Sequence, residues 1–171
     1  MKTLRLEAKH FKKTENYWKE YTGKEDINDY DGNLEIAGGL GYVKFESIKV
    51  SGYIVAEAGS GIEAGWGIKA GSGIKAGWGI KAGWGIEAGE GIVSLYSWIK
   101  AKLKISINVK CTISAGIFST SGAQDIEAQE IDGNVIYGNK ELLPKEETKF
   151  GLSGKTVKVE VDGQTYEAII K

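Results

Sequence analysis

The chain has 171 residues, and its 22 Lys and Arg nearly balance its 23 Asp and Glu, giving a net charge of −1. This length allows one domain with appendages, and the charge balance gives no overall attraction to nucleic acid or to a membrane. A single cysteine, Cys111, excludes an internal disulfide, and no apolar run resembles a signal peptide or a membrane span, so we expect a cytoplasmic protein without membrane contact.

Residues 1–33 are predicted to form a helical cap followed by an acidic loop. Large apolar residues recur at roughly helical spacing before Gly23, namely Leu4, Phe11, Trp18 and Tyr21. This spacing predicts a helix over 4–22, with a short strand at Leu4 to Leu6 as an alternative beginning. The loop 24–33 resembles a calcium loop only in Asp29, Asp31 and Gly32, and Ile27 stands where the first ligand belongs, so we expect no metal there.

The stretch 56–91 consists of six consecutive hexapeptides, AEAGSG, IEAGWG, IKAGSG, IKAGWG, IKAGWG and IEAGEG. A short, fixed period is typical of a solenoid, whose units become stable only by stacking. Within each unit the first and third residues point to one side of an extended segment and the charged second residue points to the other. The Gly-x-Gly that follows predicts a corner, with positive φ angles available to its glycines.

The charges of the repeat indicate how many hexapeptides form one coil. A coil of three hexapeptides places Glu57 beside Lys75, Glu63 beside Lys81 and Lys69 beside Glu87, so that each stacked pair is attractive. Coils of one or two hexapeptides bring like charges together. We therefore predict an all-β parallel β-solenoid with three sides and about 18 residues per coil. In this register Trp66 stacks on Trp84, and Ser60, Trp78 and Tyr96 share a column.

The GI(K/E)AGxG run resembles hexapeptide-repeat β-helix proteins, and more closely the tandem tracts of that form in small proteins of phages and other mobile elements. The resemblance implies a β-helix fold and, through proteins of that class, an inhibitor of a bacterial defence nuclease, anti-CRISPR-like. In the acyltransferases of the hexapeptide class the small residue occupies the fifth position, whereas here it occupies the third and tryptophans or serines occupy the fifth. Acyl transfer is therefore not expected.

The solenoid is predicted to span 34–142, with degenerate repeats on both sides of the strict run. Residues 99–113 alternate apolar and polar side chains without error, which predicts strand structure with Cys111 buried and a corner near Ser106. Residues 143–171 contain the only proline, Pro144, and then Val157 to Ile170 with Asp162-Gly163 between two alternating runs. This pattern predicts a C-terminal β-hairpin that closes or flanks the solenoid.

Catalytic chemistry is poorly supplied. The only histidine, His10, lies in a lysine-rich segment far from Cys111 in sequence, so a nucleophilic pair is not expected. Metal-ligand spacings such as CxxC are missing, and the glycines recur every six residues rather than opening a helix in a phosphate loop. We therefore expect a protein that is not an enzyme and that needs no cofactor.

Two sets of residues are candidate binding surfaces. The first is aromatic and lies at the predicted corners: Trp66, Trp78, Trp84 and Tyr96. The second is basic and lies on the outer face of the 99–113 segment: Lys100, Lys102, Lys104 and Lys110. Aromatic residues exposed on a soluble protein usually mark a partner, although these rings could instead pack under the N-terminal helix or form a homo-oligomer contact.

The leading hypothesis is a non-enzymatic protein-interaction module built on a β-solenoid, with a phage-type inhibitor as its most concrete form; such a protein would act in the host cytoplasm. Two alternatives stay open. The lysine row would bind nucleic acid through phosphate contacts, or the tryptophan columns would bind carbohydrate.

Overall fold

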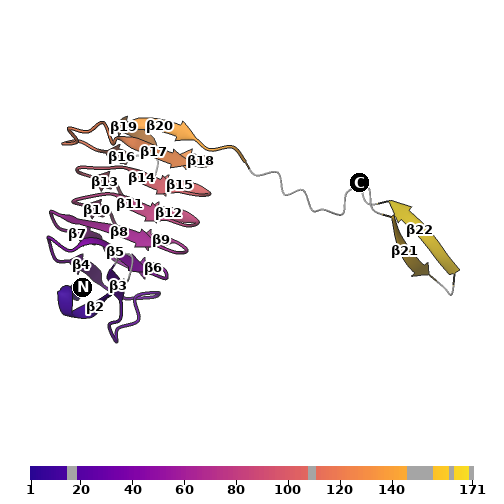
Figure 1. Ribbon diagram of the computed structural model, residues 1–171, viewed down its shortest axis with the longest axis horizontal. Coiled ribbons are helices and arrows are strands. Elements are labelled where there is room, and N and C mark those ends of the chain that lie inside the picture. The colour runs from indigo at the N-terminus through magenta and orange to yellow at the C-terminus, as the bar shows by residue number, and fades with distance from the viewer. Residues whose placement is uncertain (15–18, 108–110, 146–155, 162–163, 170–171) are drawn as a thin grey trace.

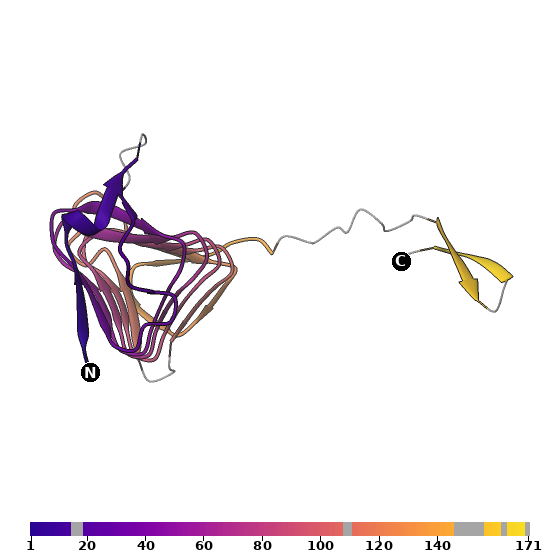
Figure 2. The ribbon, with the colours of Figure 1, turned by 90° about the horizontal axis from the view of Figure 1, so that it is seen from below.

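The computed structural model describes residues 1–14, 19–107, 111–145, 156–161 and 164–169. Figure 1 shows the chain winding upward through stacked coils, and Figure 2 shows that each coil is a triangle when viewed along the stack. Each side of the triangle is a parallel sheet, and the chain visits the sheets in the order A, B, C before starting the next coil. The predicted three-sided parallel β-solenoid is confirmed.

The three sheets are formed by short strands, one from each coil. Sheet A contains β1 (Thr3–Leu6), β4 (Asn33–Ile36), β7 (Ile54–Ala56), β10 (Ile74–Ala76), β13 (Ile92–Ser94), β16 (Thr112–Ala115) and β19 (Asn134–Tyr137). Sheet B contains β2 (Phe11–Lys13), β3 (Lys19–Tyr21), β5 (Gly41–Phe45), β8 (Ser60–Ala64), β11 (Ile80–Ala82), β14 (Ile99–Ala101), β17 (Asp125–Ala128) and β20 (Asn139–Leu142). Sheet C contains β6 (Ile48–Val50), β9 (Ile68–Ala70), β12 (Gly85–Ala88), β15 (Lys104–Ile107) and β18 (Glu130–Asp132).

The core of the solenoid is a stack of isoleucine and alanine side chains that point inward from the three sheets. In the five hexapeptides of 62–91 the first residue of each unit is an isoleucine no more than 1 % exposed, and the third is an alanine no more than 3 % exposed. In the first coil the alanine position holds Ile36, Phe45 or Val50, all buried. These larger residues fill the end of the stack. Each buried isoleucine contributes about 2 kcal/mol to the free energy of folding.

The predicted coil of three hexapeptides is confirmed inside the strict run. Ile62 pairs with Ile80, Ile68 with Ile86 and Ile74 with Ile92 in the parallel register. Two predicted ion pairs form as a result: Lys81 Nζ lies 3.3 Å from Glu63 Oε1, and Lys69 Nζ lies 2.8 Å from Glu87 Oε1. Outside the strict run the coils lengthen, because the corners contain extra residues.

The first hexapeptide, AEAGSG, does not follow the frame of the others. Ala56 ends β7 in the third, inward position, and a longer corner containing Gly59 (φ +78°) leads to the buried Ser60. The predicted pairing of Glu57 with Lys75 is therefore wrong. Lys75 lies between Val55 and Val93, and Glu57 Oε1 accepts a hydrogen bond of 2.7 Å from Arg5 Nη1.

The glycines of the strict run are needed for close stacking rather than for positive φ. Among the described residues, positive-φ glycines lie outside 62–91, so the predicted conformational role is wrong for the repeats. A Cβ added to Gly83 would lie 1.9 Å from the carbonyl oxygen of Gly65 in the preceding coil, and one on Gly89 would lie 2.0 Å from that of Gly71. The first glycine of these corners thus lets one coil approach the next.

The predicted N-terminal helix over 4–22 is wrong, and only its alternative beginning as a strand is confirmed. β1 pairs with β4, a single 3-10 turn covers Ala8–His10, and β2 pairs antiparallel with β3 at the N-terminal edge of sheet B. Strand structure is favoured because it buries Leu6 completely and covers the N-terminal edges of sheets A and B. Phe11 and Tyr21 pack against Phe45, with ring centroids 5.8 and 5.6 Å away. Residues 15–18, including Trp18, lie outside the described residues.

The alternating segment 99–113 contains a corner earlier than predicted. β14 ends at Ala101 and β15 begins at Lys104, so the corner lies at 102–103 rather than near Ser106. Leu103, which the alternation places inside, is 41 % exposed, and Cys111 is only partly buried. The alternation does not reveal the corner, because the repeat length of six residues is a multiple of the strand period of two. Apolar and polar residues therefore keep alternating in phase from one strand, through the corner, into the next.

The last coil ends with β18, β19 and β20, where Ile136 and Leu142 are 61 % and 60 % exposed. β21 (Thr156–Val161) pairs antiparallel with β22 (Gln164–Ile169). The turn at 162–163 and the connection at 146–155 lie outside the described residues. The predicted hairpin, its packing on the solenoid and the domain boundaries therefore stay predictions.

Candidate binding surfaces at two corners

Trp66 and Trp84 form an exposed ridge at the corner between sheets B and C. Both follow a strand of sheet B and precede a strand of sheet C, and Trp84 N donates a hydrogen bond of 2.7 Å to Trp66 O. Their ring centroids are 4.7 Å apart in an edge-to-face arrangement, and the predicted stacking of the two rings is confirmed. Leu103 continues the column, because its N–H bonds to Trp84 O at 2.8 Å. We call Trp66, Trp84 and Leu103 the B–C ridge; their exposed fractions are 50 %, 56 % and 41 %.

Trp78 and Tyr96 lie at a different corner, between sheets A and B. Trp78 N donates to Ser60 O at 2.8 Å, in agreement with the predicted column, whereas Tyr96 N donates to O of Gly77, the residue before Trp78, at 3.1 Å. Both side chains are exposed, Trp78 by 41 % and Tyr96 by 48 %. In the described part of the N-terminal segment the chain forms strands and a single 3-10 turn, so the alternative that these rings pack beneath an N-terminal helix is wrong.

At the A–B corner, two glycines leave a slot that an aromatic ring of the chain fills. The register places Tyr42, Gly61, Gly79 and Trp98 in one column that crosses four coils. A Cβ on Gly61 would lie 2.6 Å from Cε1 of Tyr42, and one on Gly79 would lie 2.7 Å from its hydroxyl oxygen. The Tyr42 ring thus lies over both glycines, accepts a hydrogen bond of 3.3 Å from Gly79 N and stacks on Trp98 at 5.5 Å and 7°. We call this the A–B slot.

The equivalent column at the B–C corner is Ser47, Gly67, Gly85 and Lys104. Its ends carry a serine and a lysine where the A–B slot has Tyr42 and Trp98. Among the described residues, apart from the chain neighbours of each glycine, no side chain lies within 4 Å of a Cβ built on Gly67 or Gly85. A cavity of about 380 Å³ lies here, lined by both glycines, Ser47, Lys69, Glu87 and Lys104 among others. We call it the B–C slot.

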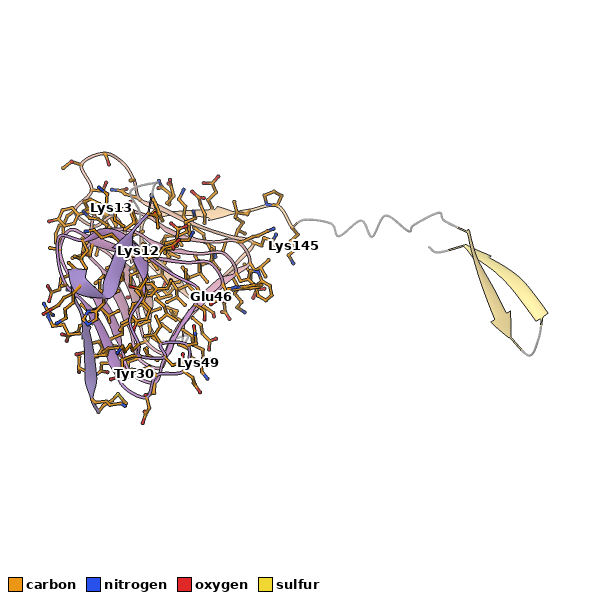
Figure 3. All side chains as sticks on the ribbon, turned by 60° about the horizontal axis from the view of Figure 1, so that its bottom comes forward. Lys12, Lys13, Tyr30, Glu46, Lys49 and Lys145 are labelled. Atoms are coloured by element: carbon orange, nitrogen blue, oxygen red, sulfur yellow. The ribbon has the colours of Figure 1, made fainter. Side chains whose placement is uncertain are left out.

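A second, larger cavity of about 530 Å³ adjoins the B–C slot at the N-terminal end of the ridge. Trp66, Phe45 and Tyr21 contribute apolar walls, while Glu46 and Asp26 contribute carboxylates. Asn28 and Ser47 line both cavities, and Ser47 Oγ donates to Asn28 Oδ1 at 2.6 Å between them. Figure 3 shows Glu46, from the larger cavity, and Lys49, from the slot, on one side of this end of the solenoid.

The aromatic surfaces include residues that sequence reasoning missed: Tyr42, Trp98, Leu103 and Phe118. Phe118 lies 5.7 Å from Tyr96, and Trp98 has Lys100 Nζ 5.6 Å from its ring centroid. The hexapeptide frame carried into IKAKLK would have placed Leu103 at the fifth position, with Trp66 and Trp84. No such signal marks Tyr42 or Phe118, because the corners before them contain inserted residues.

The predicted lysine row is divided between two sheets. Lys100 lies on β14 and forms an ion pair with Glu127, whereas Lys104 begins β15 and lies 2.6 Å from Glu130 and 3.5 Å from Asp132. Lys102 is in the corner between them, and Lys110 lies outside the described residues. The acidic partners come from the next coil and lower the positive potential that a phosphate backbone would meet.

Two exposed carboxylates near these corners have lowered pKa values. At the A–B corner, the hydrogen bond from Arg5, together with the Gly38 N–H, lowers the pKa of Glu57. At the B–C corner, the hydrogen bond from Lys104 lowers the pKa of Glu130, and the pKa of Lys104 is raised in turn, first by Glu130. Both pairs are in solvent, so they orient the corner loops more than they stabilise the fold.

His10 and Cys111 have separate surroundings. His10 Nδ1 accepts a hydrogen bond of 2.8 Å from Glu7 N at the 3-10 turn, whereas Cys111 follows β15 near the other end of the solenoid. In the part of the chain that the structure describes, no group of three or more His, Cys, Asp or Glu side chains is arranged to hold a metal ion. In the same part, none of the helical structure reaches the length and apolarity that a membrane crossing requires.

Comparison with protein-family models, with curated proteins and with solved structures gives no match to this chain.

Proposed function

We propose that the protein is a non-enzymatic interaction module whose rigid solenoid presents the B–C ridge to a protein partner. The observation that supports this most is the position of Trp66 and Trp84, each at least half exposed, at the apex of a regular corner. Their neighbours on both sides are glycines, so no side chain next to them in sequence shields the rings.

A tryptophan in the middle of a corner exposes a large apolar area and takes little stability from the fold. In the strict run glycine occupies the first and last corner positions, whereas the middle residue varies, as Ser72 and Glu90 show at the C–A corner. Here the middle position holds tryptophan. Tryptophan is enriched at protein–protein interfaces and carries a large share of the binding free energy there. Trp78 and Tyr96 form a second aromatic surface at the A–B corner, which belongs to the same proposal.

An affinity experiment tests the proposal. The parent protein is immobilised and exposed to bacterial lysate with and without nuclease, and the same is done for Trp66→Ser/Trp84→Ser. The matched control is Ile136→Ser/Leu142→Ser, which removes two equally exposed apolar side chains at the C-terminal end of the solenoid. We expect a protein that the parent and the control retain after nuclease treatment and that the ridge variant loses.

The binding free energy to that isolated protein then decides between the candidates. Each ridge tryptophan is expected to contribute about 2 kcal/mol, with weak dependence on salt. Capture that disappears with nuclease and weakens steeply with salt would favour the nucleic-acid alternative and the lysines, Lys100 and Lys104 first. Binding of free oligosaccharide to the ridge, with no protein captured, would favour the carbohydrate alternative.

A narrower proposal names the partner as a bacterial defence nuclease, with this chain acting as an anti-CRISPR-like inhibitor of phage or mobile-element origin in the host cytoplasm. It rests on the resemblance of the repeats alone. Mass spectrometry of the captured protein tests it, because a partner unrelated to defence would remove the narrower proposal and leave the broader one standing.

A further inference from the structure

We infer that the B–C slot is a binding site for a tyrosine side chain of the protein partner, which would lie in it as Tyr42 lies in the A–B slot. This inference rests on the proposed function and adds the chemistry of the contact. The two slots can be compared directly. Both contain two glycines in successive coils, but a tyrosine ring lies over the glycines of the A–B slot and not over those of the B–C slot.

The two slots lie at the same position of the repeat. Gly61 and Gly79 occupy the last corner position before Ile62 and Ile80, and Gly67 and Gly85 occupy the same position before Ile68 and Ile86. At the A–B corner a ring lies over the two glycines and bonds to a backbone N–H. A planar phenol therefore fits over two successive glycines of this repeat.

The B–C slot has room for such a ring. Chain neighbours aside, a Cβ on Gly67 would meet the carbonyl oxygen of Gly85 at 3.5 Å, and one on Gly85 would meet the backbone of Lys104, with its oxygen at 3.1 Å. The corresponding Cβ on Gly61 would collide with the Tyr42 ring. The cavity of about 380 Å³ along Gly67 and Gly85 exceeds the volume of a single tyrosine side chain.

The charges around the slot favour an uncharged ring over an anion. Lys49 lies 2.6 Å from Asp29, Lys69 lies 2.8 Å from Glu87 and Lys104 lies 2.6 Å from Glu130. Each lysine that lines the slot is thus neutralised by a carboxylate. Lys104, at the slot's end, occupies the place that Trp98 has in the A–B column.

The B–C slot lies beside the B–C ridge, so one partner can contact both. Trp66 and Trp84 precede Gly67 and Gly85 in sequence, so a partner segment that packs on the ridge lies next to the slot. One tyrosine inserted into a pocket beside two tryptophans is the arrangement of a hot spot, where a few aromatic anchors supply most of the binding.

The test uses N-acetyltyrosinamide as the probe and the amide NMR spectrum of the full chain as the readout. We expect saturable ring-current shifts at Gly67 and Gly85, with a dissociation constant on the order of millimolar, as befits a single side chain without the rest of an interface. N-acetylleucinamide and adenosine monophosphate serve as apolar and nucleobase controls and should shift these glycines less.

Two variants locate the site. Gly67→Val fills the B–C slot and should abolish the shifts at Gly85. Gly73→Val makes the same substitution at the same repeat position of the C–A corner and should leave them unchanged. Cooperative melting of each variant verifies that the fold is kept, and Gly67→Ala replaces Gly67→Val if valine disrupts it.

The inference is overturned if the probe shifts neither glycine, if leucinamide shifts them equally, if the nucleotide shifts them more or if Gly67→Val still binds. Such a result leaves the broader proposal intact as long as the Trp66→Ser/Trp84→Ser variant still loses its captured protein. Conversely, probe binding with no ridge-dependent capture would confirm the slot and remove the proposed function.

Discussion

The A–B and B–C corners are made from the same repeat, yet one completes its own surface and the other leaves it open. At the A–B corner, Tyr42 covers Gly61 and Gly79 and stacks on Trp98, so a single ring joins four coils. At the B–C corner, the same glycine column holds no ring among the described residues, and Trp66 and Trp84 project beside it. The difference teaches that inward positions and first glycines determine this fold, while the outer corner positions are free to acquire binding residues.

The largest effect is expected where both corners depend on the same core. Ile74→Asp places a charge without a partner among the buried side chains of neighbouring coils and should cost more than about 4 kcal/mol, enough to unfold the protein. Lys75→Glu, one residue away on the outer face, should change stability by less than about 1 kcal/mol. Chemical denaturation measures both, and cooperative unfolding of Ile74→Asp at the parent's midpoint would refute the inward position of this side chain.

Gly77 and Gly83 are the first glycines of an A–B and a B–C corner, and each should be indispensable. A Cβ on Gly77 would lie 2.4 Å from the backbone oxygen of Glu57, and one on Gly83 would lie 1.9 Å from that of Gly65. Gly77→Ala and Gly83→Ala should therefore each cost about 2–4 kcal/mol, measured by thermal melting, since backbone atoms must move apart.

Gly65→Ala is the matched control, because its Cβ would meet the nearest atom at 3.5 Å in the same repeat position. Its thermal midpoint should stay near that of the parent. Equal losses in Gly65→Ala and Gly83→Ala would mean that glycine acts through conformation rather than through close approach.

The second glycine should distinguish the corners. Gly61→Ala puts a methyl group into the Tyr42 ring and should cost about 1–3 kcal/mol, whereas Gly67→Ala enters the open slot and should be neutral within about 1 kcal/mol. The cost of Gly61→Ala should also fall when Tyr42→Ala is introduced first. A double-mutant cycle measured by denaturation gives this coupling, and additive costs would contradict the filled slot.

The smallest effects concern the two lowered carboxylate pKa values. Because these carboxylates ionise more readily in the folded state, their stabilising contribution is complete above the unfolded pKa and is lost as the pH falls through the folded pKa. Arg5→Gln should raise the pKa of Glu57 toward its ordinary value and leave that of Glu130 unchanged. Lys104→Gln should do the reverse. Carbon NMR titration of the side-chain carboxyls measures both, and parallel shifts in one variant would show that long-range charge, rather than these pairs, sets the values.

The coil could be predicted from the sequence because its determinants are local and repeated. Isoleucine and alanine positions define the inward face, and Lys69, Lys81 and their glutamates define the register through contacts one coil apart. The N-terminal strands could not be predicted, because Leu6 and Phe11 are in strands only through pairing with β4 and packing on Phe45, both distant in sequence.

Half of the candidate surface could be predicted for the same reason. Trp66 and Trp84 meet because they are one regular coil apart. Tyr42 enters the A–B slot through an irregular coil whose inserted residues, Gly39 and Gly41 with positive φ among them, change the spacing. No period in the sequence relates Tyr42 to Trp98, so neither the filled slot nor its open counterpart could be predicted.

The central claim, that Tyr42 and Trp98 complete the fold in the A–B slot whereas Trp66 and Trp84 form a binding surface at the B–C ridge, is tested most directly by paired thermal melts. Tyr42→Ala/Trp98→Ala should cost about 3 kcal/mol or more, since it removes two stacked, partly buried rings. Trp66→Ala/Trp84→Ala should cost no more than about 1 kcal/mol, because these rings are at least half exposed. A loss in the Trp66/Trp84 variant that equals or exceeds the loss in the Tyr42/Trp98 variant would contradict the account and assign the ridge to packing alone.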